Sequence, residues 1–179
     1  AVIYIVRDPR NVITSISNHY SLNIEESYNF MIDNNRMLVA DKWGGKNFGI
    51  SEMLGSWSQH YKSWQNIKFA PILNIKYENL INDTKNSLIT IINFLQRFIE
   101  VKVDNKKILK TVESCNFENL SKMEKKQGFD EAAYSKKTSK KVDFFHLGKK
   151  NNWKNLLNQE MEKKIREAFH DEMKELNYI

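Results

Sequence analysis

A basic side chain and a hydroxyl near the start of the chain have the types and the spacing that phosphate recognition needs. Arg7 follows the apolar run 2–6, and Ser15 comes eight residues after Arg7. A guanidinium group presents a planar fork of N–H donors to phosphate oxygens, and a hydroxyl adds one more donor. The same pair also fits an ordinary strand-to-helix turn with a solvated arginine and serine. The residues alone leave both interpretations open.

A strand that passes directly into a helix would position these two side chains. Residues 2–6 are apolar and mostly β-branched, which is typical of a buried strand covered on both faces. Asp8 is a good helix N-cap and Pro9 suits the first helical position, so we expect almost no loop between strand and helix. Arg7 then stands at the carboxyl end of the strand, where open α/β sheets place their ligands. Ser15 lies about two turns along the helix, on its polar face.

A second short strand is predicted over residues 72–77, after Pro71. Helical segments separate it from the first strand and supply a crossover, so the two strands are expected to pair in parallel. Tyr77 stands at the carboxyl end of this second strand, as Arg7 does at the end of the first.

The rest of the chain has mostly helical periodicity. Trp57, Tyr61 and Trp64 share one helical stripe, which indicates either core packing or the wall of an apolar substrate pocket. Two strands and at least five helices predict an α/β fold. Helices are expected over 25–38, from an N-cap at Ser51 through Trp64, after a cap at Asp83, over 104–114, over 117–126, and from Asn158 or Gln159 onward.

The chain is expected to form one truncated domain over residues 1–179. It contains no internal repeat and no Gly/Ser-rich linker. Two strands are too few for a stable sheet, and the sequence begins at Ala1 inside an expected strand. We therefore expect further strands of the same domain on the N-terminal side.

Composition narrows the classes of function. The chain has 179 residues and a formal charge of +6, which favours anionic ligands without requiring nucleic acid. Its one cysteine, Cys115, excludes a disulfide framework and a cysteine-based metal cluster. No apolar run approaches the roughly 20 residues of a membrane span, and no secretory signal is visible. We expect a cytoplasmic protein without a membrane partner.

Other phosphate- and metal-binding motifs are absent from the sequence. The Gly-Gly-Lys run at 44–46 lacks the spacing and the following Ser or Thr of a Walker loop. The four histidines are scattered, and no carboxylates have metal-ligand spacing, so no metal is expected. Residues 136–154 contain seven lysines and one acid, Asp143. Such a segment is typical of a solvated loop, although it also suits a loop that closes over an anion.

Several motifs, in the same order along the chain, resemble the cytosolic-type sulfotransferases that use 3′-phosphoadenosine 5′-phosphosulfate (PAPS). Residues 3–15 are similar to the family's strand–helix that holds the 3′-phosphate, which implies that role for Arg7 and Ser15. Residues 54–64 resemble its Gly-Ser-Trp helix near the acceptor pocket. Residues 75–80 and 115–120 resemble two segments that contact adenine, which implies base contacts for Tyr77, Phe117 and Leu120.

The last motif is similar to the family's Arg-Lys-Gly…Gly-Asp-Trp-Lys segment. It begins here with His146, Leu147, Gly148 and Lys149, and the resemblance implies that these residues also contact the nucleotide. His146 replaces an arginine that grips the 3′-phosphate in the family. A neutral histidine is a weaker and pH-dependent phosphate partner. Lys149 supplies positive charge nearby.

The resemblance implies a partial P-loop-like three-layer α/β unit with a parallel sheet and a mostly helical C-terminal part. It further implies transfer of a sulfuryl group from PAPS to a hydroxyl or amine of a small acceptor, with PAP as product and no metal. An apolar or aromatic acceptor would suit the three aromatic residues of segment 54–64. The family's 5′-phosphosulfate loop and catalytic histidine have no counterpart in the sequence, so no catalytic residue is assigned, and we expect the fragment to be inactive alone.

Two hypotheses of other classes remain. The net charge and the Lys-rich, aromatic-containing segments would also suit a basic nucleic-acid-binding domain without enzymatic activity, although the resemblance predicts no nucleic-acid partner. A phosphate binder of the nucleotide-kinase type is disfavoured by the lack of a Walker loop.

Overall fold

The structure, a computed structural model, describes residues 1–40, 50–130, 134–135, 138 and 140–179. Part of the Lys-rich segment, including Lys136, therefore lies outside the described residues. The order of elements is β1 (Val2–Val6), α1 (Pro9–Tyr20), α2 (Ile24–Ile32), β2 (Met37–Ala40), β3 (Ile50–Met53), α3 (Trp57–Gln65), β4 (Ile72–Lys76), α4 (Tyr77–Asn82), α5 (Thr84–Leu95), α6 (Asn105–Ser114), α7 (Phe117–Gln127), the 3₁₀ turn η1 (Gly148–Lys150), α8 (Trp153–Leu156), α9 (Gln159–Ala168) and α10 (His170–Glu175).

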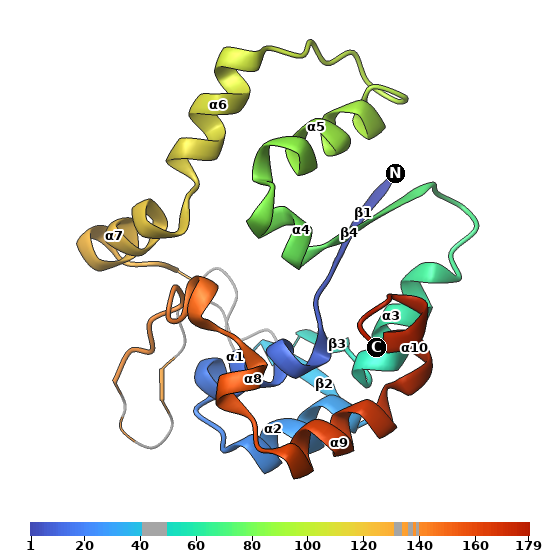
Figure 1. The fold of residues 1–179 in the computed structure, drawn as a ribbon, viewed down its shortest axis with the longest axis vertical. Helices are drawn as coiled ribbons and strands as arrows, with labels where there is room; N and C mark the ends of the chain where they lie inside the picture. The colour runs from blue at the N-terminus through green and yellow to red at the C-terminus, as the bar shows by residue number, and fades with distance from the viewer. Residues whose placement is uncertain (41–49, 131–133, 136–137, 139) are drawn as a thin grey trace.

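The parallel pair of strands lies at the centre of the fold (Figure 1). Strand β1 pairs with β4 in parallel, in a register that runs from Val2 opposite Ile72 to Val6 opposite Lys76. Only Arg7 separates the end of β1 from Asp8, the cap of α1, and β4 passes directly into α4. Both helices therefore begin at the same edge of the sheet. The predicted α/β fold with a parallel sheet is confirmed.

The predicted caps form as hydrogen bonds. The Asp8 carboxylate accepts from the backbone N–H of Arg10 at 2.9 Å, and Pro9 occupies the first helical position of α1. Asp83 caps α5 by accepting from Asn86, and Asn158 caps α9. Each cap satisfies an N–H that would otherwise lack a partner at the helix start.

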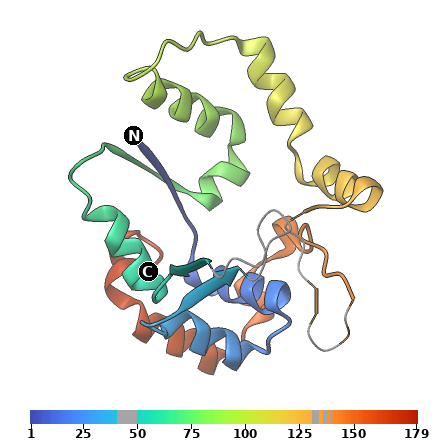
Figure 2. The same cartoon turned by 180° about the vertical axis from the view of Figure 1, so that it is seen from behind.

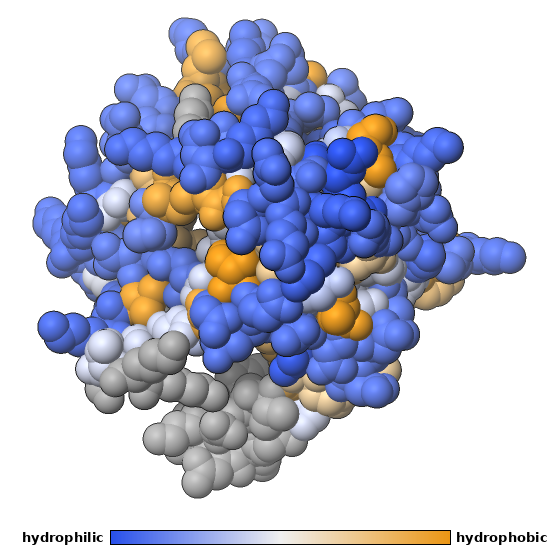
Figure 3. Space-filling model, turned by 60° about the horizontal axis from the view of Figure 1, so that its bottom comes forward, coloured by the Kyte–Doolittle hydropathy of each residue, from blue (hydrophilic) through white to orange (hydrophobic). Residues whose placement is uncertain are grey.

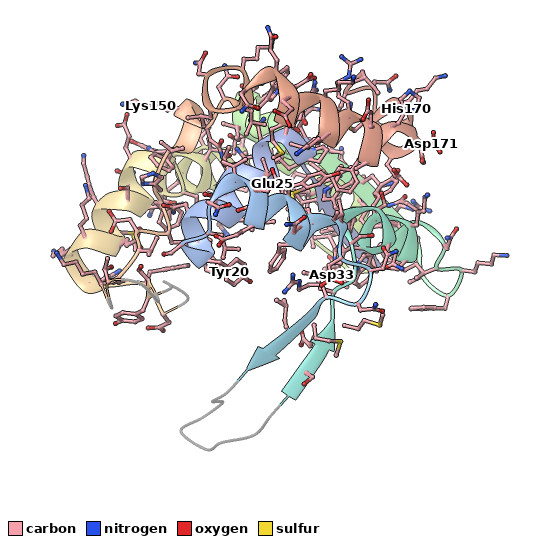
Figure 4. The ribbon with its side chains drawn as sticks, turned by 90° about the horizontal axis from the view of Figure 1, so that it is seen from below. Tyr20, Glu25, Asp33, Lys150, His170 and Asp171 are labelled. Atoms are coloured by element: carbon pink, nitrogen blue, oxygen red, sulfur yellow. The ribbon has the colours of Figure 1, made fainter. Side chains whose placement is uncertain are left out.

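Two predicted helix boundaries are wrong because local side-chain hydrogen bonds favour a turn. The helix expected over 25–38 ends at Ile32, since the Asp33 carboxylate accepts from the N–H of Asn35 and the chain leaves the helix for β2. Ser51 does not cap a helix but lies in β3, which pairs with β2 in antiparallel. The cap of α3 is Ser56, in a reciprocal capping box with Gln59. The β2–β3 pair projects from the body in Figure 4.

The main core packs α1 and α2 against α9 and α10. Its side chains come from these four helices and from the residue between α9 and α10: Ile13, Met31, Met161, Ile165, Phe169 and Met173. The helix predicted from Asn158 or Gln159 onward buries one apolar face in this core, although Phe169 leaves helical geometry and divides that helix into α9 and α10. Figure 3 brings the bottom of the Figure 1 view forward, and the surface seen there is mostly hydrophilic.

Strand β1 is not covered on both faces, which corrects the expectation from its apolar sequence. Val6 is 2% exposed, whereas Ile3 and Ile5 are 36% and 49% exposed. Successive strand residues point to opposite faces, and α3 packs on the face that carries Tyr4 and Val6. The other face has no comparable cover within the described residues.

Helices α4 to α7 follow β4 and form an arm that curves away from the main core (Figures 1 and 2). Few of their side chains are fully buried; Phe94 and Ile108 are two that are. Within the described part of the chain, no helix is long and apolar enough to cross a membrane.

Candidate functional site

Arg7, Ser15 and Tyr77 meet at the edge of the sheet where β1 and β4 end. Arg7 Nη1 donates a hydrogen bond of 3.2 Å to Ser15 Oγ, across about two turns of α1. The Arg7 guanidinium carbon lies 4.4 Å from the centre of the Tyr77 ring, which is a cation–π contact. The strand-to-helix junction therefore brings together the three polar residues that the sequence singled out.

A cleft with a volume of about 930 Å³ opens beside these residues. It lies among α1, the arm of α4 to α7 and the segment 144–151. Eight of the nine residues expected to contact a ligand line it: Arg7, Ser15, Tyr77, Phe117, Leu120, His146, Leu147 and Gly148. The ninth is Lys149, whose side chain lies outside the described part of the structure.

The lining combines hydrogen-bond donors with apolar walls. Arg7 Nε is buried and has no hydrogen-bond partner among the described residues, so one donor of the guanidinium is unsatisfied there. Much of the remaining lining is apolar, including Leu80, Leu88, Ile91, Val112, Phe144 and Phe145. A ligand with an anionic group and a flat apolar part would satisfy both kinds of surface.

Glu78 fixes the two strand ends relative to each other. Its Oε1 accepts from the backbone N–H of Asp8 at 3.1 Å, and its Oε2 accepts from the Tyr178 hydroxyl at 3.0 Å. Burial, together with the negative charge of Glu78, raises the pKa of Tyr178. The chain's C-terminal end thus helps to hold the turn that carries Arg7.

Arg10 is a structural residue that the sequence reasoning missed. It is 6% exposed and forms a buried ion pair with Asp8, with Nη2 and Oδ2 2.7 Å apart. It also bonds Glu162 and the backbone oxygen of Tyr178, and its guanidinium lies 4.0 Å from the centre of the Trp153 ring. Arg10 therefore joins the start of α1 to α8, α9 and the C-terminal end. Nothing in its local sequence indicates these distant partners.

The segment 144–151, which bounds the cleft beside α1, is anchored by Glu124 of α7. The Glu124 carboxylate is buried and accepts from the backbone N–H groups of Phe144 and Phe145, at 2.8 and 2.9 Å. The rings of both phenylalanines pack with Phe129. A charged acceptor for two main-chain donors fixes the path of the backbone just before His146.

Replacing Glu124 with glutamine is expected to loosen this segment. The neutral amide keeps one oxygen but directs an NH₂ group at the second backbone donor, so at least one charge-assisted hydrogen bond is lost. Such a bond contributes about 1.5–3 kcal/mol. Hydrogen exchange at the amides of Phe144 and Phe145 should accelerate by at least tenfold. Lys125→Gln, an exposed change on the same helix, should leave both rates unchanged; equal rates in the Glu124 variant would contradict the anchoring role.

Gly148 lets the same segment approach the ring of Phe117. Its φ is +53°, and a Cβ there would lie 2.8 Å from two ring carbons of Phe117. Backbone conformation and close approach both require glycine at this position.

Gly148→Ala is therefore expected to lower the free energy of unfolding by about 2–5 kcal/mol, from a left-handed backbone cost of about 1–2 kcal/mol and overpacking of about 1–3 kcal/mol. Urea unfolding of a double-mutant cycle with Phe117→Leu would isolate the ring contact. Gly128→Ala is the matched control, because its φ is +81° but its added Cβ would meet only Lys141 Nζ, at 3.6 Å. Gly128→Ala should be additive with Phe117→Leu, whereas additivity for Gly148→Ala would refute the contact.

The described residues of the last motif take different positions relative to the cleft. His146 lines the cleft but is exposed, and Lys150 is exposed and points outward from the body in Figure 4. The polar residue of this segment that contacts α1 is Asn151, whose Nδ2 donates to Ser15 Oγ at 3.0 Å. The sequence reasoning did not select Asn151.

The aromatic residues of α3 pack mainly into the fold. Tyr61 is 3% exposed, and the Trp57 ring contacts the rings of Tyr61 and Phe169, whereas Trp64 is 36% exposed. On the same helix His60 Nδ1 lies 3.0 Å from the Tyr4 hydroxyl. Burial raises the pKa of Tyr4 to about 12 and lowers the pKa of His60. The burial of Tyr61 and the ring contacts of Trp57 favour core packing for these two residues over the wall of a substrate pocket.

Comparison with known proteins supplies the family. A protein-family model described as the sulfotransferase domain matches residues 1–177. The chain belongs to the sulfotransferase family. Within the described residues of the chain, no group of three or more His, Cys, Asp or Glu side chains is placed to hold a metal ion.

The chain is also similar to two curated relatives and to one solved structure. It is 28% identical over 117 residues to sulfotransferase 4A1 of mouse and of rat, a match that covers 64% of this chain and 37% of each relative. Its fold is similar to that of mouse sulfotransferase SULT7A1, solved in complex with PAP, with a TM-score of 0.66 and 22% identity. That likeness covers 96% of this chain and 57% of the other. The chain thus spans little more than half the length of the solved neighbour.

Proposed function

We propose that this chain supplies the 3′-phosphate and adenine side of a PAPS site in a sulfotransferase. The proposal is carried by one observation, the hydrogen bond between Arg7 and Ser15 in the lining of a cleft that Tyr77 also lines. These are the residues to which the family resemblance assigns nucleotide contacts. The complex of the mouse neighbour with PAP is consistent with such a ligand.

The polar residues of the cleft suit a phosphate. Arg7 has a planar guanidinium with one buried donor that lacks a partner among the described residues. Ser15 lies within hydrogen-bond distance of that guanidinium, so one phosphate group could contact both. The Tyr77 ring stacks on Arg7 and limits the directions in which its donors can point.

The apolar walls suit the adenine ring. Phe117 and Leu120 come from α7, and Leu147 and Gly148 come from the segment that Glu124 anchors. A flat heterocycle stacks well on aromatic and aliphatic side chains. In this proposal the described chain binds and orients the nucleotide, and PAPS supplies the sulfuryl group.

The acceptor and the cellular setting belong to the same proposal. We expect a small molecule with a hydroxyl or amine as acceptor, and action in the cytoplasm. Packing of Trp57 and Tyr61 leaves Trp64 as the more exposed aromatic residue of α3 for an apolar acceptor. The comparisons give no support to the alternative of a nucleic-acid-binding domain.

Calorimetric titration with PAP and with adenosine 5′-monophosphate tests the proposed site. The two nucleotides differ at the 3′-phosphate, which Arg7 and Ser15 are expected to hold. One to two charge-assisted hydrogen bonds contribute about 1.5–3 kcal/mol each, so PAP should bind at least tenfold more tightly. Adenosine 2′,5′-bisphosphate, with the same charge in a different position, is the matched control ligand and should bind more weakly than PAP. Equal affinity for all three nucleotides would overturn the proposal.

A further inference from the structure

The side chain of Asn151, the residue that follows η1, is held against α1 by three hydrogen bonds. Its Nδ2 donates to the backbone oxygen of Asn11 at 3.2 Å and to Ser15 Oγ at 3.0 Å. The backbone oxygen of Asn11 can only accept, which fixes the nitrogen of the amide on this side. The other end, Oδ1, accepts from the Thr14 hydroxyl.

The segment itself is also fixed to α1. The backbone N–H of Trp153 donates to Asn11 Oδ1 at 2.9 Å, two residues after Asn151. The Trp153 ring then stacks on Arg10. Asn151 is therefore positioned before any ligand arrives, which reduces the ordering that binding would require.

Ser15 Oγ receives two hydrogen bonds at once, from Arg7 Nη1 at 3.2 Å and from Asn151 Nδ2 at 3.0 Å. A hydroxyl has two lone pairs and one hydrogen. Because both lone pairs have donors, Ser15 has only its hydrogen left to offer. That hydrogen meets the backbone oxygen of Asn11 in a long bond of 3.3 Å, so a better acceptor would displace it.

We propose that Asn151 is a positioning residue that, together with Arg7, makes Ser15 a hydrogen-bond donor toward the 3′-phosphate. This inference rests on the proposed PAPS site and names a residue that deepens it. Asn151 lies in the motif where His146 replaces the family's arginine, and it brings a donor to Ser15 from the same segment. The amide stays neutral across the physiological pH range, so its contribution does not depend on protonation as that of a histidine does.

Asn151→Asp is the sharpest test, because it changes the hydrogen-bond polarity with almost no change in shape. The carboxylate can still accept from Thr14, but it cannot donate to Ser15. It would instead accept the Ser15 hydrogen and repel a phosphate. We expect PAP affinity to fall by at least tenfold and affinity for adenosine 5′-monophosphate to change by less than about threefold. Asn151→Ala, which only removes the donor, should show the same selective loss at a smaller size.

Asn155→Asp is the matched control, since it adds the same charge at an exposed position of α8. It should leave both affinities within about twofold of the unaltered protein. Retention of PAP affinity in both Asn151 variants, with the unaltered protein still preferring PAP, would overturn the role of Asn151 and leave the proposed site intact. An equal loss for both nucleotides would overturn it too, because that result indicates a purely structural role. If the unaltered protein shows no preference for PAP, the proposed function itself fails.

Discussion

Arg7→Ala is expected to weaken binding of PAP by about ten- to a hundredfold, with little effect on adenosine 5′-monophosphate. The variant removes the charged donor that meets Ser15 among the described residues, and hydrogen bonds to charged groups contribute about 1.5–3 kcal/mol each. Calorimetric titration of each nucleotide measures the loss directly. Because the two ligands differ at the 3′-phosphate, the ratio of their affinities separates a lost phosphate contact from a general change in the cleft.

Two further variants sharpen this result. Arg7→Lys keeps the charge but loses the planar fork, so an intermediate loss is expected. Arg36→Ala is the matched control, because Arg36 also stacks on an aromatic ring, Phe30, and also has a buried Nε without a partner among the described residues. It removes the same charge away from the lining of the cleft and should leave PAP affinity unchanged. Equal affinities for PAP in the Arg7→Ala variant and the unaltered protein would refute the phosphate contact.

The junction that carries Arg7 was predictable because local chemistry determines it. The apolar run 2–6, the Asp8 cap and Pro9 together permit little but a strand that turns at once into a helix. The same holds for Asp83 and Asn158, which cap the helices expected after them. Where a helix start depends on residues within one turn, the sequence was sufficient.

The β2–β3 pair was not predicted because two nearby serines could each cap the start of α3. Ser51 and Ser56 are both plausible N-caps, but only Ser56 has a glutamine three residues later that can complete a capping box. The apolar residues at the end of segment 25–38 have helical spacing, yet the Asp33 turn interrupts them. The turn at Asp33 and the capping box at Ser56 are both visible in the sequence, and they predict the end of α2 and the start of α3.

The residues that shape the cleft were only partly accessible to sequence reasoning. Arg7, Ser15 and Tyr77 were predicted from strand ends and helix spacing. The family resemblance supplied the other cleft residues: Phe117, Leu120, His146, Leu147 and Gly148. Glu124 and Asn151 act through partners that are 20 and 136 residues away in the chain. Spacing rules describe neighbours on one helix or strand, so contacts across the fold have no periodic signature.

Arg10 is the strongest example of such a contact, and its removal has the largest expected effect on stability. Arg10→Met would leave the Asp8 carboxylate buried without its ionic partner, since both side chains are 7% exposed. Breaking a buried ion pair on one side costs about 3–5 kcal/mol, because an uncompensated charge remains. Urea unfolding should show a loss of that size. The ring of Trp153 and the backbone oxygen of Tyr178 would also lose a donor or a stacking partner.

Two comparisons identify the buried charge as the cause. Arg166→Met removes the exposed ion pair that the same Glu162 forms, 3.8 Å long, and should cost less than about 1 kcal/mol. Adding Asp8→Asn to the Arg10 variant removes the stranded carboxylate while keeping a good N-cap, so part of the stability should return. A loss below about 1 kcal/mol for Arg10→Met, or no recovery in the double variant, would show that the ion pair is not what joins α1 to the C-terminal helices. In that case packing of the main core around Ile13 and Phe169 would have to hold the Arg7 turn in place.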